Sequence, residues 1–162
     1  QAAAQSRNKL RWTRSRSPMC GALSVLSMTM SKFPAVKDST LVGTYPAVVG
    51  AGGGYVWDAV LEYRVWCHPD EGDDYYYAFS SFEEAALCSE GEAGAEAPLA
   101  LILQEEYISE EEPGQYAHVR EQRITEWPCE FLSRPRRTES TIPNFMAPNA
   151  PSNRLEIIRG QS

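Results

Sequence analysis

Alternation of apolar and polar side chains between Val60 and Trp66 gives the clearest structural signal in the chain. An extended backbone would direct Leu61, Tyr63 and Val65 to one side of the strand, and Glu62, Arg64 and Trp66 to the other. A period of two residues is typical of a β-strand. The pattern therefore predicts a half-buried strand over Val60–Trp66.

Three further segments have the composition of strands. Tyr75–Phe79 is aromatic, and Leu99–Leu103 is continuously apolar, as in a central strand, and runs on to Ile108. A turn over SEEEPGQ follows, after which Tyr116–Thr125 is predicted to pair with the preceding strand.

One helix is predicted between the second and third of these strands. Ser81 and Glu84 form an S-x-x-E capping box, and Gly91 is a suitable stop. The order strand–strand–helix–strand–strand predicts an α+β fold, with a mostly antiparallel sheet of about four strands and one packed helix. After Trp127 the chain is interrupted by prolines, which predicts short helical turns and an irregular C-terminal extension.

Charge divides the chain into two parts. The net charge of −7 combines a segment, residues 1–37, with seven basic and no acidic residues, and a remainder that holds all 22 acidic residues against eight arginines. We therefore expect a basic N-terminal extension over residues 1–37 and a single acidic domain over residues 38–162. Phosphates would be repelled by so acidic a domain, so no direct nucleic-acid partner is expected. No apolar run is long enough to span a bilayer, so a membrane would be met only through a partner.

The first thirty residues are rich in Arg and Ser and free of acids, which is typical of organelle transit peptides. We expect a plastid location on the stromal side, with the mitochondrion as the alternative. Exposed Tyr, Trp and Arg side chains are favoured at protein interfaces. The residues predicted to contact a partner are Arg7, Arg11, Trp12, Arg14, Arg16, Tyr75, Tyr76 and Tyr77.

Three groups of residues are candidates for a metal site, a phosphate-binding loop or reactive thiols. His68, His118 and a carboxylate of the HPDEGDD loop could in principle hold a metal, but their spacing matches no metal signature. The glycines of residues 50–54 are not followed by the Lys-Ser/Thr of a phosphate-binding loop. The four cysteines form no C-x-x-C pair and are expected to be buried thiols. We predict no metal, no cofactor and no catalytic residue.

From about residue 30 to residue 160 the chain resembles a family of small bacterial proteins identified as GNAT-type N-acetyltransferases. The stretches that carry the resemblance are residues 32–69, 74–85 and 97–160, with Ala97-Pro98 where the family tends to have Glu-Pro. The resemblance implies an acyl-CoA-dependent N-acyltransferase. GNAT enzymes bind the cofactor's pyrophosphate through an Arg/Gln-x-x-Gly-x-Gly/Ala loop, and Gln115-Tyr116-Ala117-His118 lacks its first glycine. No functional residue is therefore carried over.

These observations support two principal hypotheses. The first is a non-catalytic accessory subunit that docks on a large organellar complex, a plastid photosystem before a mitochondrial complex. The alternative is an acyl-CoA-dependent N-acyltransferase with a degenerate cofactor loop. A third is a small metal- or ligand-binding domain that uses the His68 loop.

Overall fold

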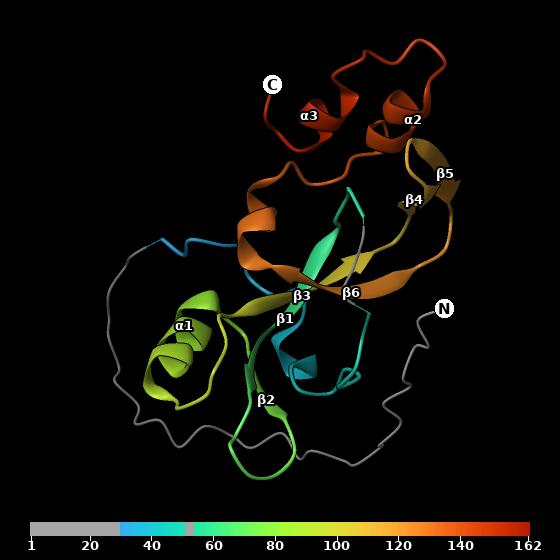
Figure 1. Cartoon of the computed structure of the whole chain (residues 1–162). Helices are drawn as coiled ribbons and strands as arrows, with labels where there is room; N and C mark the ends of the chain where they lie inside the picture. Colours follow the sequence, from blue (N-terminus) through green and yellow to red (C-terminus); the bar gives the residue numbers. More distant parts are fainter. Residues whose placement is uncertain (1–29, 51–53) are drawn as a thin grey trace, which may run out of the picture.

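The computed structural model describes residues 30–50 and 54–162, and it confirms the α+β fold. Four antiparallel strands form the main sheet in the order β2–β1–β3–β6 (Figure 1). Their bounds are β1 Ala59–Cys67, β2 Tyr75–Phe79, β3 Leu99–Gln104 and β6 Arg123–Pro128. No helix of the described ranges is long and apolar enough to cross a membrane.

A second sheet contains only β4 (Tyr107–Glu112) and β5 (Gln115–Val119). The sequence predicts one long strand over Leu99–Ile108 and another over Tyr116–Thr125, and both predictions are wrong in length. Each is broken in two, because Glu105 donates its backbone N–H to the side chain of Asp58 (2.7 Å) instead of continuing the ladder. The hairpin therefore bends, and its outer half leaves the main sheet.

Helix α1 (Phe82–Gly91) begins where the capping box places it. The Ser81 hydroxyl accepts a hydrogen bond from the backbone N–H of Glu84 (3.3 Å), which satisfies one of the free donors of the first turn. Ala85 and Cys88 are buried against the main sheet. This confirms the predicted helix and its packing.

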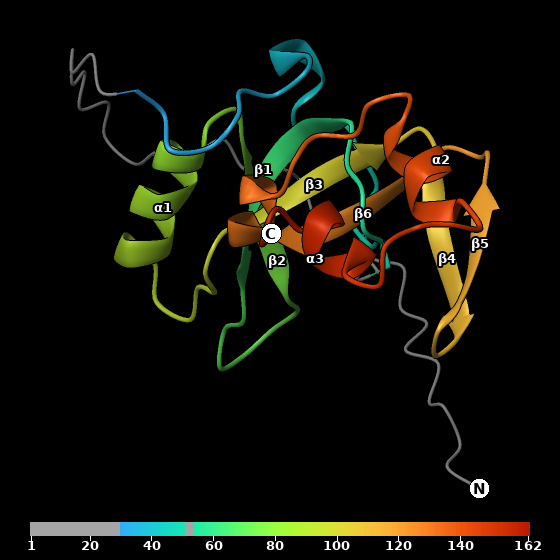
Figure 2. The ribbon, with the colours of Figure 1, turned by 90° about the horizontal axis from the view of Figure 1, so that it is seen from above.

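The proline-interrupted C-terminal segment forms short helical turns, as predicted. They are the 3-10 helix η2 (Cys129–Ser133), α2 (Thr141–Met146) and α3 (Arg154–Ile158), and another 3-10 turn, η1 (Ser39–Leu41), lies near the start. Viewed from above, α2 and α3 lie beside the β4–β5 hairpin, whereas α1 lies at the opposite end of the molecule (Figure 2). Between α2, α3 and the hairpin is a small core of Val56, Ile108, Ile142, Phe145 and Ile158.

Strand β1 is buried on both faces, which corrects the prediction of a half-buried strand. Glu62 and Arg64 are both 0% exposed, because residues 43–47 cover their face of the sheet. A register shift between Val60 and Glu62 also turns Leu61 to that covered face, away from Tyr63. A bulge of this kind reverses the alternation that the sequence pattern assumes.

Among the described residues, those from Ser31 onward are already packed on the body, ahead of the predicted boundary at Asp38. The Ser31 hydroxyl and the backbone N–H of Lys32 both donate to the carboxylate of Glu83 at the start of α1, at 2.9 Å. Phe33 is 8% exposed and packs edge-to-face on Phe82, with ring centroids 4.6 Å apart. The chain that precedes Ser31 therefore joins the body beside the first turn of α1.

Candidate functional site

The residues predicted to contact a partner fall in two places. Arg7, Arg11, Trp12, Arg14 and Arg16 lie outside the described residues. Tyr75, Tyr76 and Tyr77 form the first part of β2, at the outer edge of the main sheet.

Within that group, Tyr75 and Tyr77 are partly exposed and pack edge-to-face at 5.5 Å. Tyr76 is 7% exposed, and its ring lies 4.6 Å from the guanidinium of Arg64 and 5.0 Å from the ring of Trp66. A partner on this edge would therefore meet Tyr75 and Tyr77, and the interface itself stays a prediction.

The two histidines do not share a site. His68 lies between Asp74 (Nδ1 to carboxylate, 2.9 Å) and Glu96 (Nε2 to carboxylate, 2.9 Å). His118, on β5, bonds to Glu106 at 3.2 Å. In the described residues no group of three or more His, Cys, Asp or Glu side chains is placed to hold a metal ion. The geometry gives each histidine the role of an ion-pair partner.

His68 should make the stability of the protein depend on pH. Its pKa is raised above the usual 6.5, first by the hydrogen bond to Asp74 and also by Glu96. A raised folded-state pKa means that the protonated ring adds stability fully below the unfolded value, and that this is lost as pH rises through the folded pKa. His68→Gln should therefore lower the urea midpoint more at about pH 5.5 than at about pH 8.5. An equal effect at both pH values would show that the ring does not titrate in this pair.

The cysteines of the described chain are buried thiols. Cys67, Cys88 and Cys129 are free and buried, as expected, and Cys20 lies outside the described residues. Burial raises the pKa of Cys67, and it raises that of Cys129 to about 12. Cys129 also donates to the carbonyl of Pro98 at 3.2 Å. The thiols of Cys67 and Cys129 are therefore protonated at neutral pH and poorly suited to nucleophilic chemistry.

We therefore predict that Cys67, Cys88 and Cys129 resist thiol reagents at about pH 8 while the protein is folded. Peptide mapping after maleimide treatment should find all three unlabelled in buffer and labelled in denaturant, with Cys20 as the internal comparison. Rapid labelling of Cys129 in the native protein would contradict its burial.

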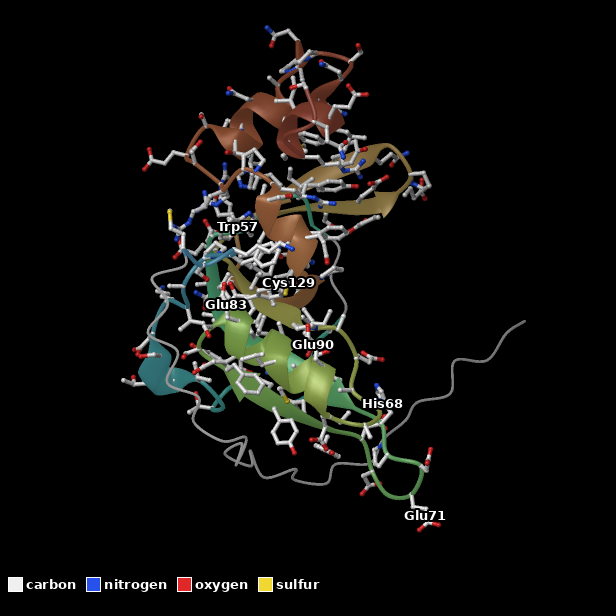
Figure 3. The ribbon with its side chains drawn as sticks, turned by 90° about the vertical axis from the view of Figure 1, so that its left-hand side faces the viewer. Trp57, His68, Glu71, Glu83, Glu90 and Cys129 are labelled. Atoms are coloured by element: carbon white, nitrogen blue, oxygen red, sulfur yellow. The ribbon has the colours of Figure 1, made fainter. Side chains whose placement is uncertain are left out.

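An acidic face covers α1 and the loop between β1 and β2. Figure 3 shows Glu83 and Glu90 at opposite ends of α1, and Glu71 at the tip of that loop near His68. Lys32 and His68 are the cationic side chains beside this face. The residues of the acidic face are Asp70, Glu71, Asp73, Asp74, Glu83, Glu84, Glu90, Glu92 and Glu96.

An ionic cluster joins the bent hairpin to the C-terminal segment. Arg137 donates to Asp58 at 2.8 Å, and it also lies 3.7 Å from Glu105 and 3.5 Å from Glu106. Its backbone N–H bonds to the carbonyl of Trp57 at 3.0 Å. Both Arg137 and Asp58 are nearly buried, at 14% and 12% exposed. The cluster is a structural tie at the bend, because Arg137 bonds to the segment around Asp58 through both its side chain and its backbone.

A shallow cavity of about 380 Å³ opens beside the hairpin. Tyr55 donates its hydroxyl to Glu110, and burial, then this bond, raises the pKa of Tyr55 to about 12. The bond from Tyr55, then that from the Gly114 N–H, lowers the pKa of Glu110. Both groups are therefore held in their usual charge states at neutral pH. The cavity is lined by Gly54, Tyr55, Ile108, Ser109, Glu110, Pro113 and Arg123.

Arginines gather in the C-terminal third, a second division of charge that our sequence analysis missed. Residues 38–119 contain seventeen acidic residues and one arginine, whereas residues 120–162 contain five acidic residues and seven arginines. Counting charged residues along the sequence is enough to reveal this division. The contacts of these arginines with aromatic rings cannot be read from the sequence.

Comparison with known proteins adds no family to this description. No family model matches the chain, and no curated protein or solved structure matches it either.

Proposed function

We propose that this protein is a non-catalytic accessory subunit that docks on a large organellar protein complex, in the first place a plastid photosystem and otherwise a mitochondrial complex. The observation that carries the proposal is the point at which the basic segment joins the body. Ser31 and Lys32 are bonded to Glu83, so the acid-free segment of residues 1–29 joins the body at one end of the acidic face.

This connection attaches a segment of positive charge to one end of the acidic face. The acidic face can meet a basic surface, and the arginines of residues 7–16 can lie along a neighbouring acidic one. Charge complementarity of this kind speeds encounter and fixes orientation more than it adds affinity. Two charged elements on one chain add contact area to a single interface, so they act best together on one partner.

The histidine contacts support a docking role in a second way. The two histidines considered as metal ligands each bond to carboxylates of the same chain: His68 to Asp74 and Glu96, and His118 to Glu106. The Arg- and Ser-rich composition of the first thirty residues supports an organellar location.

Isolation of the native protein under mild conditions tests the proposal. We expect it to migrate on a native gel with a photosynthetic or respiratory complex, and to be released by salt, because screening weakens exposed charge contacts. The variant E71R/E90R should lower co-migration by about tenfold or more. The matched control E111R/E112R makes the same charge change on the β4–β5 hairpin and should leave co-migration unchanged.

Migration as a free 18.1 kDa monomer would overturn the proposal. That outcome would favour the acyltransferase alternative, which predicts measurable acetyl-CoA binding by calorimetry.

A further inference from the structure

Two arginines near the C-terminus form no ion pair with an acidic side chain of the described residues. Arg134 follows η2 and Arg159 follows α3, and neither guanidinium forms an ion pair or a hydrogen bond with any group of the described residues. All 22 acidic residues of the chain lie in the described part, so no acidic side chain outside it could pair with either arginine. The Nε atom of Arg159 is buried and has no hydrogen-bond acceptor.

Close backbone packing brings these two arginines together. Gly160 has φ +69°, and a Cβ atom there would lie 2.9 Å from Cδ of Pro135. The segments Arg134-Pro135 and Arg159-Gly160 are therefore in direct contact, and only glycine fits at position 160. The carbonyl of Arg134 also accepts a hydrogen bond from the indole of Trp57 at 3.1 Å, which fixes its backbone.

Aromatic rings hold both guanidinium groups. Arg134 lies 3.8 Å from the ring centre of Phe131, and Arg159 lies 5.8 Å from that of Tyr55. An aromatic ring attracts the flat face of a guanidinium and leaves its N–H groups, which lie in its plane, free to bind an oxyanion at two points.

The positive charges of Arg134 and Arg159 lie close enough to repel each other. The pKa of Arg134 is lowered, first by burial and then by the positive charge of Arg159. The nearby carboxylate of Glu110 is held by Tyr55 and by the Gly114 N–H, and it forms no ion pair with Arg159. The charge of Glu110 therefore acts on Arg159 from a distance, without an ion pair, and both guanidinium groups keep their N–H groups free for an added anion.

We propose that Arg134 and Arg159 form a binding site for the phosphate group of a soluble ligand. A phosphate monoester carries nearly two negative charges at neutral pH and has three acceptor oxygens, which suits two guanidinium groups. A carboxylate has only two acceptor oxygens and one charge, and it matches two guanidinium groups less well. This site does not depend on the proposed docking function, since it lies outside the acidic face.

Titration of the full chain with inorganic phosphate at low ionic strength, followed by calorimetry or ³¹P line broadening, tests the site. We expect saturable binding at one site, weakened by about tenfold or more in R134Q/R159Q. R120Q removes the same kind of charge from an exposed position between β5 and β6 and should bind phosphate like the wild type. R134K/R159K keeps both charges without the two-point geometry, so its affinity should fall between the two.

Circular dichroism should show that each variant is folded before its affinity is compared. The proposal is overturned if the folded wild type binds no phosphate saturably, or if R120Q weakens binding as much as R134Q/R159Q does. Displacement of phosphate by acetate at equal ionic strength would assign the site to carboxylates and would also overturn it.

Discussion

Arg64→Met should destabilise the protein by about 3–5 kcal/mol, the usual cost of removing one partner from a buried ion pair. Arg64 bonds to Glu62 at 2.6 Å and to Glu126 at 2.7 Å, and the side chains of Arg64 and Glu62 are 0% exposed. Without the guanidinium, two carboxylates remain beside the sheet with little access to water. Their uncompensated charge accounts for most of the expected loss.

The same substitution should also loosen the segment that covers this face. Arg64 donates to the carbonyls of Pro46 and Ala47, and its partner Glu62 accepts from the backbone N–H of Gly43 at 2.7 Å. These bonds attach residues 43–47 to β1. Hydrogen exchange in that segment should therefore rise in Arg64→Met by more than the global loss of stability explains.

Urea unfolding followed by tryptophan fluorescence measures the effect. Arg120→Met is the matched control, since Arg120 is exposed, and it should change stability by less than about 0.5 kcal/mol. Neutralising the orphaned acids in R64M/E62Q/E126Q should recover part of the loss. An Arg64→Met protein as stable as the control would mean that the cluster is not buried.

The second large effect is expected at the bend of the hairpin, where Asp58→Ala should cost about 2–3 kcal/mol. One carboxylate oxygen of Asp58 accepts from Arg137 at 2.8 Å, and the other accepts from the backbone N–H of Glu105 at 2.7 Å. Removing it leaves two donors at a nearly buried position. Glu105 and Glu106 limit the loss, since they still compensate the charge of Arg137.

Limited proteolysis distinguishes this tie from an ordinary loss of stability. Asp58→Ala should be cut faster than the wild type within residues 134–141, because that segment loses the bond from the Arg137 side chain to Asp58. Asp58→Asn keeps an acceptor for the Glu105 N–H and should lie between the two. Asp70→Ala, in the exposed β1–β2 loop, is the control and should behave like the wild type. Equal cleavage of all four proteins would contradict a role for Asp58 at the bend.

Local signals in the sequence predicted the elements whose structure is decided locally. The capping box at Ser81 and Glu84 located the start of α1, and the aromatic run Tyr75–Phe79 located β2. The prolines after Trp127 correctly indicated short turns. In each case the stabilising contact lies within a few residues, so composition and spacing are sufficient.

Predictions that depended on distant contacts were wrong. Alternation in β1 predicted an exposed face for Glu62 and Arg64, but residues 43–47 cover it, and the bulge at Leu61 changes which side chains share a face. The long strand through Ile108 was expected because the apolar run is continuous. Asp58, far away in the chain, ends that strand by accepting the N–H of Glu105.

The candidate sites likewise include features that local sequence predicts and features that depend on contacts between distant residues. Adjacent charges made the acidic face predictable in composition, whereas Arg134 and Arg159 come together only through the contact of Pro135 with Gly160. The histidine pair suggested by the sequence fails because His68 directly follows β1, whereas His118 lies in the separate hairpin.

The outer edge of β2 has a consequence for self-association. No other strand of the described chain pairs with this edge, and β2 meets β1 without a bulge and contains no proline or lysine, the usual protections of an exposed edge. Acids flank it instead, in residues 70–74 before the strand and at Glu83 and Glu84 after it. Two copies pairing antiparallel through β2 would bring these acids together. We therefore expect repulsion to oppose pairing of two copies through β2, and to weaken when acid neutralises the carboxylates or salt screens them.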